Sequence, residues 1–425
     1  MKSFFIDFLK GIVTVVISAA VGLILLLLVF LLPIGRIQGN VYESVSVLAS
    51  EANVQNIYFG FNSSVDNYTD GIMIEAASYV PQEEVSLLDR VLQIYIVDGR
   101  DENGWSISIN HLIADYFTNA PDVTYIEMTY PRYWHGYLVY LKPLLTVFDW
   151  TTIRMLNFAF QVLLAALLIW MLVKKNKKGL ILPFVMSYLM LIPTVIGRCM
   201  QLSDCYYIYV LALIFMVWKF DWLMERRRMD FLFLWIGIIL AYVDFLTYPL
   251  VTFIIPLMAY FALKGMSGTI RDILDMIEKG LFWGVGYVGM WASKWILASI
   301  FTDENVVMNA IEQIIYRTSS TDSTGSYEVG LGTVLGVNIG GIINPFTMLA
   351  VIMTVGLLVY SLIKKQFDLR QAGLFFLLGI TPFMWYVICR EHSYQHYYFT
   401  SKELIITGFA MLCMFMPGLC AKNET

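Results

Sequence analysis

The sequence predicts an all-α polytopic membrane protein with about ten transmembrane helices and a long first extracytoplasmic loop that carries surface helices. Of its 425 residues, 58% are hydrophobic and only 14% are charged. The mean hydropathy of +0.67 is typical of polytopic membrane proteins rather than soluble ones. Apolar runs near bilayer length recur along the chain, and basic residues cluster in alternate loops between them. We therefore treat residues 1–425 as a single membrane domain.

The apolar runs give the order of the predicted spans. The first, residues 11–33, follows Lys2 and Lys10 and lacks a small-residue cleavage site, so we expect a retained transmembrane helix rather than a signal peptide. Residues 34–150 form the first extracytoplasmic loop, and the other spans fall within residues 152–420. Their positions are about 152–173, 180–197, 205–219, 230–248, 250–264, 281–300, 343–363, 372–389 and 404–420.

Loop charges predict the orientation. With the N-terminus in the cytoplasm, the inside segments contain 17 of the 28 basic residues and every basic cluster, which places both termini in the cytoplasm. These residues are Lys2, Lys10, Lys174, Lys175, Lys177, Lys178, Lys219, Arg226, Arg227, Arg228, Lys264, Arg271, Lys279, Lys364, Lys365, Arg370 and Lys422. We interpret the inside clusters as topology signals and residues 266–279 as a short interfacial helix. All four histidines fall outside, so any chemistry is expected there.

The two large outer loops differ in character. The first carries amphipathic stretches such as residues 83–96, suited to a helix lying on the membrane or on other spans. The second, residues 302–338, begins with a helical pattern at 306–316 and becomes rich in Ser, Thr and Gly at 318–327. That composition fits a mobile segment over a site and fits an idle linker equally well.

Asp66 and Asp70 are the candidate catalytic residues. At i,i+4 spacing on a helix their carboxylates share one face. This arrangement suits a general base with a supporting acid, or a divalent cation site for Mg²⁺ or Mn²⁺. The alternative is a helix start in which Asp66 is the N-cap and Asp70 lies in the first turns.

Residues 130–136 place three unlike side chains together just before an apolar run. Arg132, Trp134 and His135, with Tyr130, suit a pocket that holds a phosphate and a sugar. The alternative is an interfacial belt, in which Tyr and Trp lie at headgroup level and Arg extends to the membrane surface.

Two further outer segments supply candidate substrate contacts. Asp244 lies between two apolar runs, where a carboxylate is costly unless it is paired, and Arg198 or Lys294 are the expected partners. In the last outer segment, a zinc pair is a weak interpretation because the HExxH pattern is missing. Contacts to phosphate and hydroxyl groups, or to lipid headgroups, fit better. The residues of that segment are Arg390, His392, His396 and Lys402.

Five stretches together resemble a group of multi-pass bacterial membrane proteins, and the architecture resembles the GT-C class of polyprenyl-phosphate-sugar-dependent glycosyltransferases. The stretches are residues 66–73, 130–145, 244–251, 286–295 and 392–400. The resemblance implies a hexosyltransferase-type reaction at the outer leaflet, with Asp66 or Asp70 as the loop base. One departure is that the acidic pair follows the first span at a greater distance than is usual in that class.

The expected function is therefore transfer of a sugar from a polyprenyl-phosphate donor to a glycan, lipid or protein acceptor of a bacterial cell envelope, on the extracytoplasmic side of the cytoplasmic membrane. Arg132, Arg390 and His135 would contact the departing phosphate, and Trp134 and Tyr130 the sugar. Two alternatives are a lipid-linked glycan flippase or transporter and a non-catalytic envelope-assembly subunit. A transporter requires polar residues deep in several spans, whereas here they gather at one side. The chain has no basic patch for nucleic acid.

Overall fold

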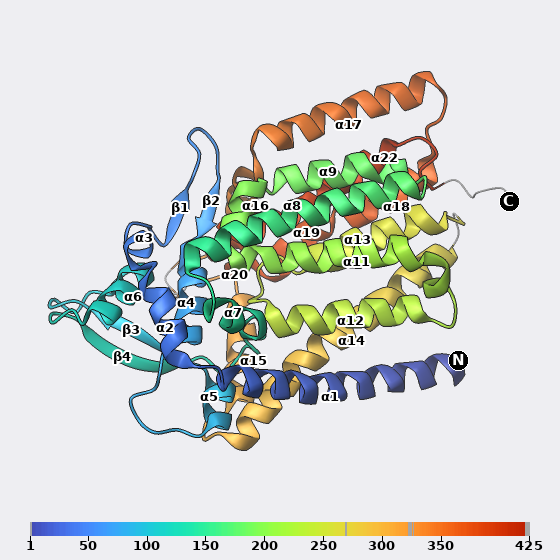
Figure 1. The fold of residues 1–425 in the computed structure, drawn as a ribbon. Coiled ribbons are helices and arrows are strands. Elements are labelled where there is room, and N and C mark those ends of the chain that lie inside the picture. The colour runs from blue at the N-terminus through green and yellow to red at the C-terminus, as the bar shows by residue number, and fades with distance from the viewer. Residues whose placement is uncertain (1, 268–269, 322–324, 326, 421–425) are drawn as a thin grey trace.

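The computed structural model describes residues 2–267, 270–321, 325 and 327–420, and these residues are mostly helical (Figure 1). Residues 322–324, 326 and the predicted inside residue Lys422 lie outside the described part. The helices are α1 (Lys2–Phe30), α2 (Ile34–Tyr42), α3 (Val45–Ala49), α4 (Asn67–Ser78), α5 (Leu87–Gln93), α6 (Ile109–Thr118), α7 (Leu138–Leu145), α8 (Trp150–Lys174), α9 (Ile181–Met190), α10 (Pro193–Arg198), α11 (Met200–Met224), α12 (Arg228–Val243), α13 (Leu250–Lys264), α14 (Ile270–Phe301), α15 (Val306–Arg317), α16 (Leu331–Ile342), α17 (Pro345–Ile363), α18 (Leu369–Gly379), α19 (Thr381–Ile388), α20 (Arg390–Gln395), α21 (Tyr397–Thr400) and α22 (Ile405–Phe415), with 3-10 turns η1 (Lys178–Leu180) and η2 (Ser401–Leu404).

The long helices lie side by side in a bundle, and Lys2 and Cys420 lie at the same end of it (Figure 1). We call this the terminal end, and we call the opposite end, which carries residues 34–149, the loop end. Among the described residues, six segments are long and apolar enough to cross a membrane: residues 4–30, 150–174, 200–224, 345–363, 369–388 and 397–415. The structure is thus compatible with an all-α membrane protein. Helices also occupy the other four predicted spans, but they are shorter or carry more charge.

Residues 34–149 form a compact region of short helices and two β-hairpins, which the expectation of an all-helical chain omitted. Strand β1 (Val54–Asn56) pairs with β2 (Ser64–Asp66), and β3 (Tyr95–Arg100) pairs with β4 (Thr124–Thr129), both antiparallel. The amphipathic stretch 83–96 is helical only over α5. It turns at Ile94, whose φ is +46°, and continues as strand β3.

Small residues allow the closest helix contact of the bundle, between α12 and α14. A Cβ atom at Gly237 would lie 2.2 Å from the backbone oxygen of Trp283, and one at Gly286 would lie 2.2 Å from that of Leu234. Neither backbone can retreat without losing its helical hydrogen bonds, so larger residues would separate the helices. This contact fixes α14, which in turn supports the loop end.

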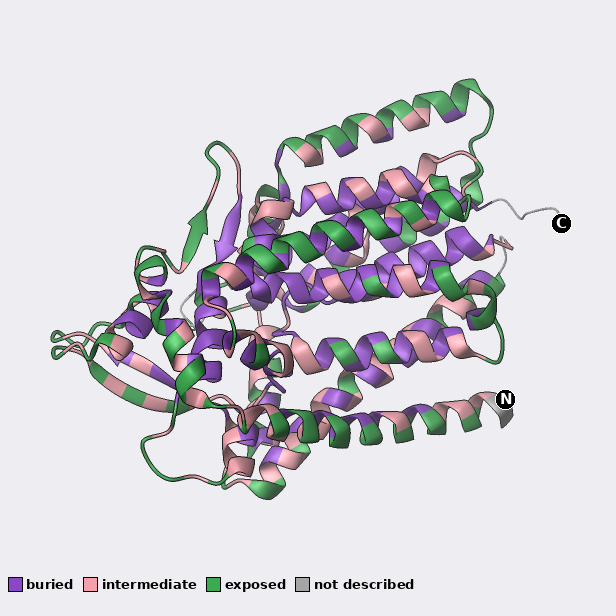
Figure 2. Cartoon of the chain, viewed as in Figure 1, coloured by how far each residue is buried: buried purple, intermediate pink, exposed green. Residues whose placement is uncertain are grey.

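Burial follows the position of each helix in the bundle (Figure 2). Helix α13 is buried almost throughout, whereas α17 and the outer side of α1 are largely exposed and apolar, as expected for surfaces that meet lipid. The prediction of a short interfacial helix at residues 266–279 is wrong, because residues 270–279 belong to α14, which runs unbroken from Ile270 to Phe301. Residues 268–269 lie outside the described part. The predicted helix at 306–316 is confirmed as α15.

Candidate functional site

Asp66 lies at the junction of the β1–β2 hairpin and α4, and it caps that helix. Its Oδ1 accepts a hydrogen bond from the Thr69 backbone N–H at 3.0 Å, and its Oδ2 accepts one from the Thr69 hydroxyl at 2.7 Å. The residue is 1% exposed. Burial raises the pKa of Asp66 to about 6, and the hydrogen bonds to Thr69 and the charge of Lys402 limit the rise. A carboxyl group with this pKa can exchange a proton near neutral pH.

Asp70 has a different environment, because it joins two parts of the chain. Its oxygens accept hydrogen bonds from the backbone N–H groups of Met200, at 3.1 Å, and Gln201, at 3.0 Å. These are the first residues of α11, whose N-terminal N–H groups have no partner within the helix. Burial raises the pKa of Asp70 to about 7, and the charge of Arg154 opposes that rise. Asp70 therefore serves as a cap for α11.

The two carboxylates do not form an open set of metal ligands. Both oxygens of each accept hydrogen bonds from the protein. Within the described residues, no group of three or more His, Cys, Asp or Glu side chains is placed to hold a metal ion. We therefore derive no step through a metal.

Helix α21 of the last outer segment packs against β2, which ends at Asp66, and the charge of Lys402 acts on that carboxyl group. We call the polar side chains that follow from there the polar seam. The Lys402 Nζ donates a hydrogen bond to the Tyr398 carbonyl at 2.7 Å, and the Tyr398 hydroxyl lies 3.2 Å from His396 Nδ1. The ring of His396 lies 4.9 Å from that of His392, centroid to centroid. The polar seam thus consists of Asp66, Lys402, Tyr398, His396, His392 and Arg317.

Arg317 closes the seam, and its position also fixes the tautomer of His392. The guanidinium donates to His392 Nδ1 at 2.7 Å and to the Tyr133 hydroxyl at 3.2 Å. Because an arginine only donates, Nδ1 accepts, and the Nε2–H donates to the Leu246 carbonyl at 3.0 Å. Burial, aided by the charge of Arg317, lowers the pKa of His392 and lowers that of His396 to about 4. Both imidazoles are neutral at pH 7.

In the loop at residues 130–136, some side chains lie beside the polar seam and others lie in the buried core. The Arg132 guanidinium lies 5.2 Å from the centre of the Tyr130 ring and donates a hydrogen bond to the Asn309 Oδ1, on α15, at 2.9 Å. The Tyr130 ring packs edge-on against Tyr133, which the seam reaches through Arg317. Tyr130 and Arg132 therefore lie beside the polar seam.

Trp134 and His135 are buried, each 1% exposed. The indole N–H donates to the Met290 carbonyl of α14 at 2.6 Å. The His135 ring contacts the Tyr137 hydroxyl at 2.9 Å and the Tyr130 carbonyl at 2.8 Å, so both ring nitrogens have partners. These two side chains hold the loop against the bundle, and their contact with a substrate stays a prediction.

Asp244 and Lys294 do not form the ion pair that we expected. Asp244 accepts hydrogen bonds from the backbone N–H of Thr247, at 3.0 Å, and from the Thr247 hydroxyl. Lys294 instead donates to the carbonyl groups of Leu92, at 2.7 Å, and Val91, at 3.4 Å, at the end of α5. Asp244 stabilises a turn, and Lys294 satisfies a helix end. Arg390 begins α20 and is half-buried.

An apolar groove of about 650 Å³ lies between α8, α11 and α12. Exposed side chains such as Phe160, Leu211 and Trp235 line it, so it opens toward the outside of the bundle. At its loop end, Asp204 accepts a hydrogen bond from the Tyr140 hydroxyl at 2.6 Å. The groove could hold a hydrocarbon chain with its polar end toward the loop end.

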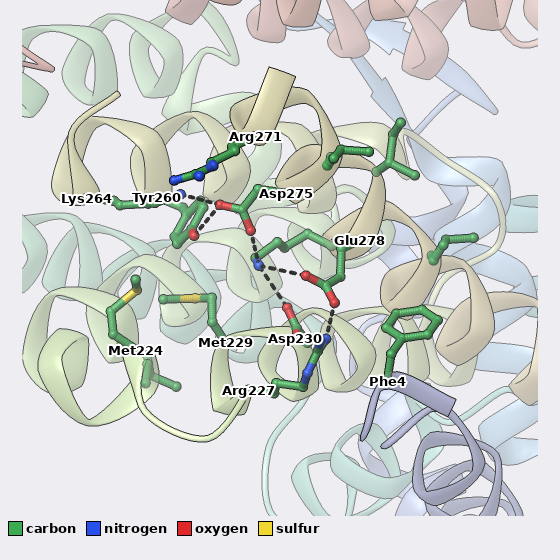
Figure 3. A pocket seen from close by; sticks show the side chains of 15 residues that line it. Phe4, Met224, Arg227, Met229, Asp230, Tyr260, Lys264, Arg271, Asp275 and Glu278 are labelled. Carbon is green, nitrogen blue, oxygen red and sulfur yellow. Dashed lines mark hydrogen bonds and ion pairs between the residues drawn. The ribbon is translucent and has the colours of Figure 1, made fainter. Parts of the chain in front are cut away.

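A charged pocket of about 670 Å³ lies at the terminal end (Figure 3). The Lys279 ammonium contacts Asp230 at 2.8 Å and also Asp275, and Arg227 pairs with Glu278. Lys264 reaches Asp275 at 2.5 Å. The pocket joins α12, α13 and α14 through ion pairs. From the sequence, we interpret Arg227 as part of a topology signal and residues 266–279 as an interfacial helix, because the ion-pair partners are far apart in the sequence.

Sequence reasoning missed Arg317, Tyr398 and Tyr133. Arg317 ends an amphipathic helix in a loop whose composition fits a mobile segment over a site and an idle linker equally well, and the available signal was its position at the start of the Ser/Thr/Gly-rich segment. Comparisons of the chain with family models, with curated proteins and with solved structures found no match.

Proposed function

We propose that this protein is a membrane glycosyltransferase that moves a sugar from a polyprenyl-phosphate donor to a cell-envelope acceptor. The observation that carries the proposal is a buried carboxyl group with a raised pKa at one end of the polar seam, on which the charge of Lys402 acts, with a second cation, Arg317, at the other end of the seam. Asp66 belongs to the first outer segment, whereas Lys402 and Arg317 come from the end of the chain and from α15. A transfer that releases a phosphate needs these two kinds of group together.

In the proposed reaction, Asp66 accepts the proton of the acceptor hydroxyl. The acceptor oxygen forms a bond to the anomeric carbon of the sugar, and the bond from that carbon to the donor phosphate breaks. The polyprenyl phosphate leaves with an added negative charge, which Lys402 and Arg317 stabilise. Because Asp66 is 1% exposed, the reaction requires α21 and β2, which are in contact, to separate when the acceptor binds.

Two surfaces support the assignment of donor and acceptor. The apolar groove between α8, α11 and α12 has the volume and openness for a polyprenyl chain that remains partly in lipid. On the first outer segment, a hollow of about 540 Å³ is lined by tyrosines and amide side chains, a combination suited to sugar rings and hydroxyl groups. Its tyrosines are Tyr42, Tyr79, Tyr116 and Tyr125.

The finer topology belongs to the same proposal. We infer ten spans, both termini in the cytoplasm and an extracytoplasmic loop end, in a bacterial cytoplasmic membrane. The distribution of 17 of the 28 basic residues supports that orientation.

The test measures release of polyprenyl phosphate by the purified protein from a panel of polyprenyl-phosphate sugars. We expect release with at least one donor, and a loss of about 100-fold or more in Lys402→Met, because the leaving phosphate loses a cation. Lys364→Met, an exposed lysine after α17, is the control and should retain the wild-type rate. Saturable binding of lipid-linked glycans without release from any donor would favour a transporter or an assembly subunit instead.

A further inference from the structure

Two adjoining hollows at the loop end lie on the other side of strand β2 from the polar seam. Their volumes are about 370 Å³ and 220 Å³, and both are lined by Arg154 of α8 and Arg198 of α10. Val65 and Asn67 line the smaller hollow, whereas Asp66 between them lies near Lys402. Since successive residues of a strand point to opposite sides, the two regions are separate. We call the pair of hollows the rim hollow.

The rim hollow has an excess of positive charge. Arg154 is 8% exposed, and its guanidinium holds both oxygens of Glu51, at 2.7 and 2.9 Å, and the Asn67 Oδ1 at 3.1 Å. Its Nε–H is buried without a hydrogen-bond partner in the described part of the chain. Arg198 is exposed, and none of the ion pairs between described residues includes it. Among the residues that line the hollow, two arginines face one carboxylate, which is an excess of one positive charge. Asp70, on which the charge of Arg154 also acts, is not a lining residue, and burial raises its pKa to about 7.

Hydroxyl groups and an apolar wall complete the rim hollow. The Tyr58 hydroxyl lies 2.8 Å from that of Thr194, and Thr151 is a further lining residue. Met155, 69% exposed, and Phe158 form the wall on the outer side of α8. Helix α8 is one of the segments long and apolar enough to span a membrane. The arginines and hydroxyls thus lie next to a surface suited to lipid chains.

We propose that the rim hollow binds the phosphate group of an anionic lipid, with the lipid chains along the outer side of α8. A phosphate accepts hydrogen bonds from guanidinium and hydroxyl groups together, and its charge offsets the excess of +1. The exposed Arg198 guanidinium and the hydroxyl groups of Tyr58 and Thr194 supply the donors that such a ligand would bind. The site is separate from the proposed transferase centre and does not depend on that activity.

The test is lipid retention measured by native mass spectrometry of the full chain in detergent, which requires no turnover. We expect phosphatidylglycerol to be retained over phosphatidylcholine, and Arg198→Gln to reduce that retention about tenfold, because it removes one charge-assisted contact. The control is Arg36→Gln, an exposed arginine on α2, which should behave as wild type. Equal retention in wild type and Arg198→Gln would overturn the proposal.

A second arm separates a lipid from free phosphate as the source of the ligand. Met155→Gln changes the wall without touching the arginines, so it should weaken phosphatidylglycerol binding and leave binding of inorganic phosphate unchanged. If inorganic phosphate displaces the lipid completely at equal concentration and Met155→Gln has no effect, the hollow is a site for free phosphate and the lipid assignment is wrong.

Discussion

The pair Asp66 and Asp70 offers the sharpest test. Replacing Asp by Asn should mainly lower activity at Asp66 and mainly lower stability at Asp70, four residues away. In Asp66→Asn the amide oxygen still accepts from the Thr69 N–H, and asparagine is as good an N-cap as aspartate. The amide NH₂ can meet the Thr69 hydroxyl, which is able to accept as well as donate. We expect the free energy of unfolding to change by less than about 1 kcal/mol.

Asp70→Asn should instead destabilise the fold. The two carboxylate oxygens accept from the N–H groups of Met200 and Gln201, and an amide offers only one acceptor oxygen. Its NH₂ group would face a backbone N–H that then has no partner. Leaving one buried donor unsatisfied costs about 1–3 kcal/mol, and α11 also loses a negative charge near its N-terminus, worth about 0.3–1 kcal/mol.

The activities of the two variants should differ in the opposite sense from their stabilities. If Asp66 is the base, Asp66→Asn lowers the rate of polyprenyl phosphate release by about 10²–10⁴-fold, while Asp70→Asn retains most activity at temperatures where it is folded. Unfolding is followed by denaturant titration, and release by quantifying the lipid product. Asp122→Asn, an exposed position, is the control for both assays. Full activity in Asp66→Asn, or an inactive but stable Asp70→Asn, would refute the division of roles.

Two further predictions concern stability. Lys279→Met removes the cation shared by Asp230, which is buried, and Asp275, which is half-buried. Each carboxylate keeps a second cation, Arg227 or Lys264, so the free energy of unfolding should fall by about 1–3 kcal/mol, whereas Lys364→Met should change it by less than about 0.5 kcal/mol. Similar midpoints for both variants in a denaturant titration would contradict the role of the charged pocket. Burial lowers the pKa of His135 from 6.5 to about 3, so between those pH values the unfolded chain binds a proton that the folded chain does not. The free energy of unfolding should therefore fall with falling pH by up to about 1.4 kcal/mol per pH unit. His135→Gln should reduce this slope, and an unchanged slope in unfolding measurements from pH 7 to 5 would show that the histidine titrates normally.

Features that depend on neighbouring residues in the sequence could be predicted, whereas contacts between residues far apart in the sequence could not. Bilayer-length apolar runs predicted the long helices, because their length and composition are local properties. The capping role of Asp66 was also open to local reasoning and was weighed as an alternative. The hairpin of β3 and β4 was missed, although residues 95–97 and 124–129 are rich in the β-branched and aromatic residues that favour strands.

The fate of residues 130–136 could not be predicted from the segment itself. Whether Trp134 and His135 face a ligand or the core depends on the carbonyl of Met290 and the hydroxyl of Tyr137. The first of these is 156 residues away, and the close contact between α12 and α14 determines its position. The seam similarly joins Asp66 to Arg317 through residues of the last outer segment, and no periodicity in the sequence relates these positions.

The charged pocket at the terminal end and the polar seam at the loop end satisfy their cations in different ways, and this difference indicates where an anion can bind. At the terminal end, Arg227, Lys264 and Lys279 all pair with carboxylates, so their charges are already offset. At the loop end, Lys402 donates to a backbone carbonyl, and Arg317 donates to a neutral imidazole and a phenol. Carbonyls and imidazoles satisfy hydrogen bonds without removing net charge. A cation held in this way retains its attraction for an anionic ligand, and Lys402 and Arg317 lie in the same seam as Asp66, the carboxyl group that we propose as the base. Substrate phosphate should therefore bind at the loop end, and a substitution that adds a carboxylate beside Lys402 should weaken binding even with every present hydrogen bond intact.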